Sequence, residues 1–303
     1  MHADVRTVHD IGGGGKSHPG DLALQWADMD FPVFTLVNAF GQITVAEYGG
    51  QLLSWRTGDG VEQLYSPEPL RMYPERALRG GVPVCFPQFS GRGALPKHGL
   101  VRTKPWRLRA KTDSALILAI EDDAGTRTQW PYAFELMQTI VLDAGGLSMA
   151  LDVHNRSALP MLFTAALHTY LRVDDVTRCV LHGLDGREYE DAADAGRYKT
   201  QHDGLRIAGE VDRVFADAPE SLILQRSALR QAQGANQDLR IEQGGFRDSV
   251  VWCPGPDIAA AFTDMPAEDW QRMLCVEAAA AARPVSVSAG GHWQGWQRLI
   301  PMP

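Results

Sequence analysis

Two residues whose side chains exchange protons lie among apolar neighbours in this sequence. His168 lies in L-F-T-A-A-L-H-T-Y-L-R-V, and Glu277 ends the apolar run M-L-C-V-E. Histidine titrates near neutral pH, and apolar surroundings raise the pKa of a carboxyl group, so the two types suit general acid and base catalysis. From the neighbours alone, a hydrogen-bonded core histidine is favoured at position 168, and a strand-end glutamate facing water at position 277.

A second group of candidate residues lies in the stretch Arg79–Trp106, which contains four prolines and five glycines. The cations Arg79, Lys97 and Arg102 lie within it, and so does His98. Proline and glycine disfavour strand and helix interiors, so the stretch predicts a long loop that crosses a sheet and brings these groups together. The alternative is a structural crossover whose charges only face solvent.

The elements that would position these residues are short strands. From Phe34 onward the sequence is rich in β-branched and aromatic residues, with a Gly-Gly break at residues 49–50 and Asp-Ala-Gly turns at residues 123–125 and 143–145. One short helix is predicted at Pro266–Met273, where proline and early acids precede a late arginine. Strands are predicted at residues 42–48, 51–55, 107–110, 115–121, 134–142, 147–155, 161–173, 222–224, 239–242, 250–252, 274–277, 285–288 and 294–299.

This pattern predicts an all-β protein, a large antiparallel β-sandwich with few short helices. We expect a single domain at residues 31–303, with a long surface loop at Ser227–Gln237, after a flexible N-terminal arm at residues 1–30. The arm contains G-G-G-G-K-S, but Asp10 stands where a phosphate-binding loop needs its first glycine. A nucleotide site is therefore not predicted there.

Composition excludes several classes of protein. The chain has 303 residues, of which 45% are hydrophobic and 22% charged, and no apolar run long enough to span a bilayer. A formal charge of -8 argues against a nucleic-acid binder, and any anionic ligand needs a local cluster of cations. The four cysteines lie at no metal-ligand spacing and predict buried free thiols. The first residues lack the pattern of a secretion signal, so we expect none. We expect a cytoplasmic monomer that binds neither membranes nor nucleic acid.

The loop sequence also resembles a known family. R-G-G-V-P-V-C-F-P, then L-P-K-H-G-L-V-R and a tryptophan, are similar to the glucose-6-phosphate 1-epimerase branch of the aldose 1-epimerase superfamily. Four further segments resemble the family in the same order: A-L-H-T-Y-L, E-V-D-R-V-F, V-V-W-C-P-G, and C-V-E-A with the distant H-W. The resemblance implies a galactose mutarotase-like β-sandwich and reverses the preference for a core histidine at position 168.

The resemblance implies a role for each candidate residue. His168 would be the catalytic acid and Glu277 the base, while Asp212 would contact sugar hydroxyls. Arg79 and Arg102 would contact the 6-phosphate, and we include Lys97 beside them and place His98 on the sugar. An alanine run, residues 278–282, replaces the family's usual proline and glycine and predicts a different loop after Glu277.

The implied reaction is interconversion of the α and β anomers of a hexose 6-phosphate, with D-glucose 6-phosphate expected. Ring opening needs one proton delivered to the ring oxygen and one removed from the anomeric hydroxyl, so no cofactor or metal is required. Two alternatives stay open: an aldose 1-epimerase for unphosphorylated sugars, and a non-catalytic sugar-phosphate-binding regulatory protein. The presence of both an acid and a base speaks against the second.

Overall fold

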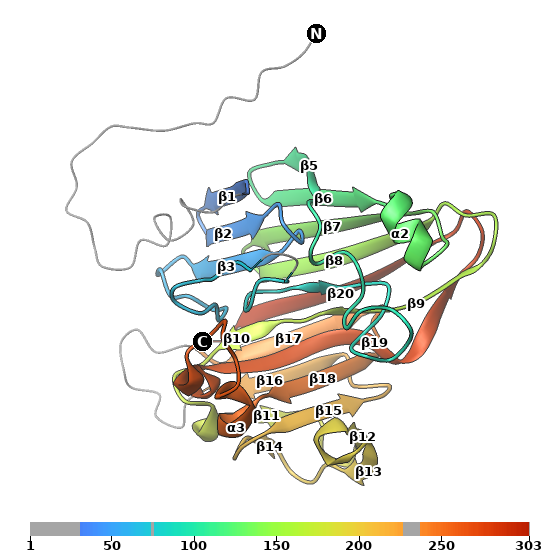
Figure 1. The fold of residues 1–303 in the computed structure, drawn as a ribbon. Helices are drawn as coiled ribbons and strands as arrows, with labels where there is room; N and C mark the ends of the chain where they lie inside the picture. Colours follow the sequence, from blue (N-terminus) through green and yellow to red (C-terminus); the bar gives the residue numbers. More distant parts are fainter. Residues whose placement is uncertain (1–30, 74–75, 227–236, 303) are drawn as a thin grey trace, which may run out of the picture. The chain divides into compact units, whose positions relative to one another are not determined.

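Antiparallel strands account for most of the regular structure of the described residues. The computed structural model describes residues 31–73, 76–226 and 237–302 (Figure 1). The predicted arm at residues 1–30 and nearly all of the predicted loop at Ser227–Gln237 lie outside these residues.

The largest sheet has nine strands, and each pairs antiparallel with its neighbours. Buried and half-buried residues alternate regularly along its two longest hairpin strands, as expected where one sheet face meets a core. Its strands, in spatial order, are β14 (Leu205–Arg206), β11 (Val180–His182), β16 (Ser221–Gln225), β17 (Leu239–Gly244), β20 (His292–Pro301), β8 (Gly146–Asn155), β7 (Phe134–Asp143), β6 (Ala115–Glu121) and β5 (Arg107–Lys111).

Two further sheets, of eight and three strands, are also antiparallel. The eight-stranded sheet consists of β13 (Arg197–Thr200), β12 (Glu188–Asp191), β15 (Val211–Phe215), β18 (Asp248–Cys253), β19 (Met273–Val287), β9 (Met161–Leu167) and β4 (Val84–Cys85), with β10 (Tyr170–Arg172) paired to β19. The three-stranded sheet consists of β1 (Val33–Asn38), β2 (Gly41–Ala46) and β3 (Leu52–Thr57).

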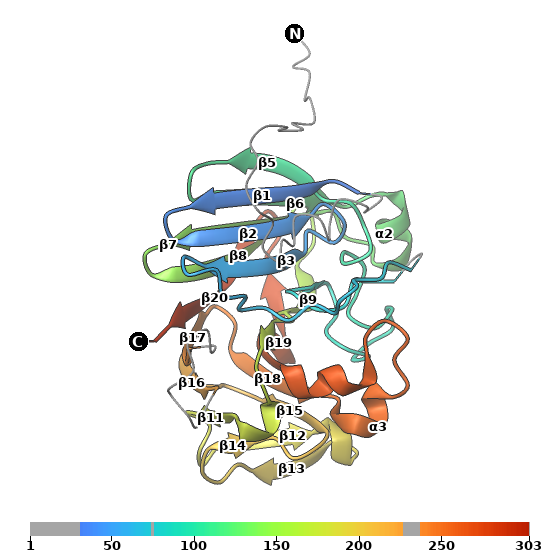
Figure 2. The ribbon, with the colours of Figure 1, turned by 90° about the vertical axis from the view of Figure 1, so that its left-hand side faces the viewer.

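The three sheets pack as two layers around one core. Figures 1 and 2 show β1 to β3 continuing the layer of β9, β19 and β18, with the nine-stranded sheet as the other layer. A single apolar cluster joins all three sheets and includes Trp55, Val84, Phe134 and Val276. The predicted β-sandwich is confirmed.

Helices are few and short, as predicted. Within the described residues they are α2 (Ala124–Gln129), α3 (Gly255–Ala259) and the 3₁₀ turns η1 (Val176–Arg178), η2 (Ala192–Asp194) and η3 (Ala267–Arg272). The helix predicted at Pro266–Met273 is therefore present as the tighter η3. Among the described residues, none of the helices has the length and apolarity needed to cross a membrane.

Two strand predictions differ from the structure. Residues 161–173 do not form one strand, because the chain breaks between β9 and β10 at His168–Thr169. Leu274–Glu277 and Val285–Ser288 are not separate strands with a loop between them, because β19 continues through the alanine run. The small side chains let this strand stay buried as far as Ala281, and the Asp248 carboxylate accepts the backbone N–H groups of Ala281 and Ala282 at 2.8 Å each.

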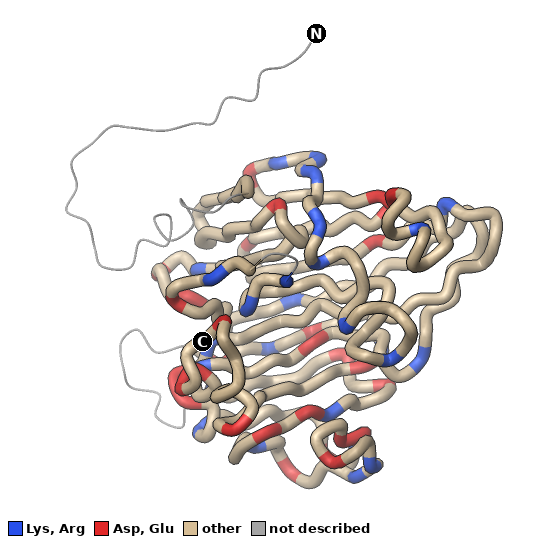
Figure 3. The backbone as a smooth tube through the Cα atoms, in the orientation of Figure 1, with Lys and Arg blue, Asp and Glu red and all other residues tan. Residues whose placement is uncertain are grey.

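The stretch Arg79–Trp106 is the predicted loop, with the two-residue β4 as its regular strand. Figure 3 shows Lys and Arg segments along it where it crosses in front of the sheet. Its glycines permit close backbone approach: Gly81 has φ 59°, and a Cβ there would lie 2.1 Å from the Leu52 carbonyl oxygen. A Cβ on Gly99 would lie 2.2 Å from the Phe86 oxygen, which explains glycine after His98.

Candidate active site

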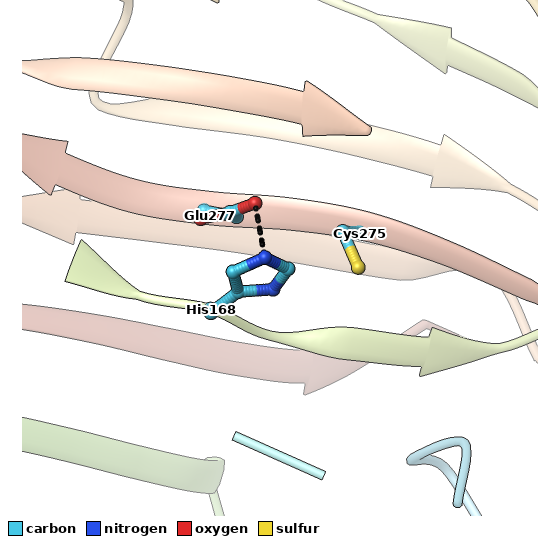
Figure 4. A group of neighbouring side chains, drawn as sticks. All are labelled: His168, Cys275 and Glu277. Atoms are coloured by element: carbon cyan, nitrogen blue, oxygen red, sulfur yellow. Dashed lines mark ion pairs between the residues drawn. The ribbon is translucent and has the colours of Figure 1, made fainter. Parts of the chain in front are cut away.

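The break between β9 and β10 places His168 against Glu277 of the neighbouring β19. His168 Nε2 lies 3.3 Å from Glu277 Oε1, and the dashed line in Figure 4 marks this contact. His168 is 8% exposed and Glu277 1%. Beside the break, the Thr169 hydroxyl donates to the Gln297 side-chain oxygen at 2.6 Å, which anchors the backbone that carries the histidine. The two candidate acid and base residues thus form one buried pair.

Burial shifts the pKa values of both partners toward their uncharged forms. It raises the pKa of Glu277 well above its ordinary value, and the Asp212 carboxylate adds to this rise. It lowers the pKa of His168 well below its ordinary value, and His98 and Arg102 lower it further. The pair is therefore arranged to hold one proton between two groups, which suits transfer of that proton in either direction.

Each partner also has a second polar atom that is buried and lacks a partner. Glu277 Oε2 and His168 Nδ1 make no hydrogen bond with any residue that the structure describes. Buried polar atoms are nearly always hydrogen-bonded, so these two atoms are the ones that a ligand would satisfy.

His98 packs against His168 and is held by its own loop. The two ring centroids are 5.3 Å apart. The backbone N–H of Ser90 donates to His98 Nδ1 at 3.3 Å, and the Cys85 sulfur lies 3.1 Å from the same nitrogen. Burial, followed by Arg102, lowers the pKa of His98 to about 3. The ring is therefore neutral and carries its proton on Nε2, where it can donate to a ligand.

Aromatic side chains complete the wall around His168. Tyr170 stacks on the imidazole with centroids 4.9 Å apart and 16° between the planes, and Trp252 meets it edge-on at 5.9 Å. The sequence arguments missed both residues. Tyr170 follows His168 by two positions in A-L-H-T-Y-L, a spacing that places two strand residues on one face and could have indicated it.

Asp212 lies on β15, two strands away from Glu277. It pairs in register with Trp252 of β18, which in turn pairs with Cys275 of β19. Burial raises the pKa of Asp212, while Lys97 lowers it. The Asp212 carboxylate also raises the pKa of Glu277, so the two carboxyl groups lie close enough to interact electrostatically.

The predicted cations line a cavity of about 520 Å³ that leads to His168 and Tyr170. Arg102 is half-buried and donates from its guanidinium to the Lys97 carbonyl oxygen at 2.9 Å. Two further lining cations, Arg76 and Lys104, were not predicted from the sequence. His168 therefore faces a cavity with positively charged walls, whereas Glu277, His98 and Asp212 are not among the residues that line it.

Arg79 also lines the cavity but is held by neighbours there. Its guanidinium makes a two-oxygen ion pair with Asp264, at 3.0 Å for the shortest contact, and donates to the Tyr170 hydroxyl at 3.3 Å. It lies over the Phe262 ring at 4.2 Å. Nothing in the sequence indicated Asp264 or Phe262 as neighbours of this loop.

Other residues of the loop serve its own structure. The Gln88 side-chain amide donates to the carbonyl oxygens of Ser90 and Leu95 and accepts the Leu95 N–H, so it braces the turn. Arg92 makes a two-nitrogen ion pair with Glu190. Neither lines the cavity.

Within the described part of the chain, one group of three potential metal ligands lies close together, and it includes the His168 and Glu277 pair. His168, Cys275 and Glu277 offer one ligand atom each, all within 4.8 Å of one another. Burial raises the pKa of the Cys275 thiol well above its ordinary value, which disfavours the thiolate that metals bind. All four cysteines are buried and free, as predicted.

Comparison with known proteins covers nearly the whole chain. The sequence pattern of the aldose 1-epimerase family matches residues 32–299. A protein from Cenchrus ciliaris, provisionally named a glucose-6-phosphate 1-epimerase, is 31% identical over 84% of this chain and 80% of its own length. A protein from Escherichia coli K12 with the same provisional name is 28% identical over 79% and 80%.

A solved structure agrees with the fold. The crystal structure of a protein from Salmonella typhimurium, provisionally named a mutarotase, matches with a TM-score of 0.78 and 25% identity. The match covers 90% of this chain and 92% of that one.

Proposed function

Because the chain belongs to the aldose 1-epimerase family, we propose that it interconverts the α and β anomers of a hexose 6-phosphate, with D-glucose 6-phosphate as substrate. The family makes the chain an epimerase, an isomerase of sugars. Our proposal goes further than the family in two respects. It names a phosphorylated sugar as the substrate, and it assigns the residues that act on each end of that sugar.

The observation that carries the proposal is that a buried histidine and carboxylate pair lies next to a cavity lined by cations. A buried histidine lines a cavity whose walls carry cations, and a buried carboxylate lies 3.3 Å from that histidine. Both partners have a buried polar atom without a partner among the described residues. A sugar hydroxyl and a ring oxygen are suitable partners for these atoms, and a phosphate is a suitable partner for the cations.

We assign the proton transfers as follows. Glu277 removes the proton of the anomeric hydroxyl while His168 donates a proton to the ring oxygen, and the bond between the anomeric carbon and that oxygen breaks. The open-chain aldehyde rotates, and ring closure on its other face returns both protons. The pair ends with the protonation state in which it began, so no co-reactant is consumed.

The remaining residues position the sugar. Neutral His98 donates a hydrogen bond to a hydroxyl or assists the acid, and Asp212 accepts one from another hydroxyl. Arg102, Lys97 and Arg79 attract the phosphate against the overall charge of -8. Relatives named as glucose-6-phosphate 1-epimerases support the phosphosugar as substrate.

Exchange NMR on equilibrated anomers tests the proposal. The rate of conversion between α and β anomers is measured for glucose 6-phosphate and for glucose, each with and without the protein. We expect strong acceleration for glucose 6-phosphate and weak acceleration for glucose. Equal acceleration of both sugars would favour an enzyme for unphosphorylated aldoses, and binding without acceleration would favour a regulatory protein.

A further inference from the structure

The contact between Arg79 and Asp264 bears on how the site chooses its substrate. Three hydrogen bonds to the carboxylate, at 3.0, 3.1 and 3.2 Å, and one to the Tyr170 hydroxyl engage all three nitrogens of the Arg79 guanidinium. The Phe262 ring covers one face of its plane. Four of the five N–H donors of the guanidinium are thus engaged, so a phosphate that binds two of them must displace a contact to Asp264 or to Tyr170.

Asp264 also differs in charge from its surroundings. It is the one acidic residue among the described residues that line the cavity, and five cations line the same cavity. Its side chain is 17% exposed and that of Arg79 is 19%, so both reach the cavity space rather than the core. Asp264 lies in the segment between α3 and η3, outside regular structure, where a small backbone shift can move it away.

We propose that Asp264 is a specificity-determining residue that occupies Arg79 until a doubly charged phosphate group displaces it. A sugar phosphate carries a charge of about -1.5 to -2 at pH 7 and three acceptor oxygens, against -1 and two for a carboxylate. A neutral sugar hydroxyl offers neither, so it leaves the ion pair intact. This inference rests on the proposed function and adds the residue that sets the preference for phosphate.

The test compares four variants with the wild type. Asp264→Asn removes the competing charge, and Asp264→Ser replaces it if the first variant does not fold. Glu190→Gln is the matched control, since it frees Arg92 of the same loop by the same change in charge away from the cavity. The double variant with Arg79→Gln and Asp264→Asn tests whether any gain in phosphate affinity depends on Arg79.

Two readouts separate this inference from the proposed function. Titration calorimetry with inorganic phosphate measures binding without any turnover, and exchange NMR gives KM and kcat for glucose 6-phosphate. We expect Asp264→Asn to bind phosphate and glucose 6-phosphate about threefold to tenfold more tightly, with kcat and the KM for glucose little changed. Glu190→Gln should match the wild type, and the double variant should lose the gain.

Several outcomes would overturn the inference. A weaker affinity for phosphate in Asp264→Asn would show that Asp264 holds Arg79 in place for the ligand instead of competing with it. An unchanged affinity, or a gain that survives loss of Arg79, would show that the ion pair has no part in selection. If the wild type accelerates no sugar while the calorimetric gain is present, the proposed function fails and the competition for Arg79 stands.

Discussion

Replacing Arg102 with alanine should weaken binding of glucose 6-phosphate specifically. Arg102 lines the cavity, is half-buried, and has no acidic partner among the residues that the structure describes. Its guanidinium donates a hydrogen bond to a neutral group, the Lys97 carbonyl oxygen. The guanidinium therefore has donors and charge available for a phosphate.

The magnitude follows from the strength of a charged hydrogen bond. Such a contact contributes about 1.5–3 kcal/mol, which corresponds to a rise in KM of about 10- to 150-fold. Arg102 also lowers the pKa of His168, so a change in kcat of up to about threefold is expected beside it. The KM for glucose should stay within about twofold of the wild type.

Exchange NMR at a series of sugar concentrations measures these constants. Arg92→Ala is the control, because Arg92 lies in the same loop but pairs with Glu190 outside the cavity. A similar loss for glucose and glucose 6-phosphate would refute the reasoning, since it would make Arg102 a structural residue. So would an Arg92→Ala variant with the same defect as Arg102→Ala.

Three further predictions concern stability and pH. The pKa of His98 is about 3 in the folded protein against 6.5 in the unfolded chain, so its contribution to stability is present above pH 6.5 and lost as pH falls toward 3. Between pH 7 and 5, urea unfolding should show that the free energy of unfolding falls by about 2 kcal/mol more for the wild type than for His98→Asn. Equal losses in the two proteins would contradict this prediction. Gly81→Ala should lower the free energy of unfolding by about 2–4 kcal/mol, because φ is 59° and a backbone oxygen would lie 2.1 Å from the new Cβ. Gly91→Ala, with open space around it, should cost less than about 1 kcal/mol, and similar losses would argue against a backbone cause. Asp212→Asn should move the acid limb of the rate profile to lower pH, because Asp212 raises the pKa of Glu277, and an unmoved limb would separate the two carboxyl groups.

The elements of the fold follow from local patterning where strands are regular. The strand predicted at residues 115–121 has the observed bounds, and the alternation along 134–142 and 147–155 gives the hairpin of β7 and β8. Local patterning did not predict where a strand ends when hydrogen bonds to distant residues set that end. The break after Leu167 depends on Pro83 and Gln297, which are distant in sequence and accept from the chain there.

The site residues could be predicted from the sequence only where they lie in motifs that resemble the family. His168 and Glu277 carry no local sign that they face each other, and the apolar neighbours alone favoured a core histidine; the family resemblance identified the pair, and strand register explains their contact. Asp264 could not be predicted, because its partner Arg79 lies 185 residues away and only the folded chain brings them together.

The pairing of His168 with Glu277 is tested most directly by the exchange rate of glucose 6-phosphate with the wild type, His168→Gln, Glu277→Gln and the double variant. General acid and base catalysis contributes about 10²- to 10⁴-fold, so each single variant should slow exchange by that amount. Because the two residues act as a unit, the double variant should be no more than about tenfold slower than either single variant. Near wild-type exchange in a folded single variant, or losses that multiply in the double variant, would contradict a shared proton transfer.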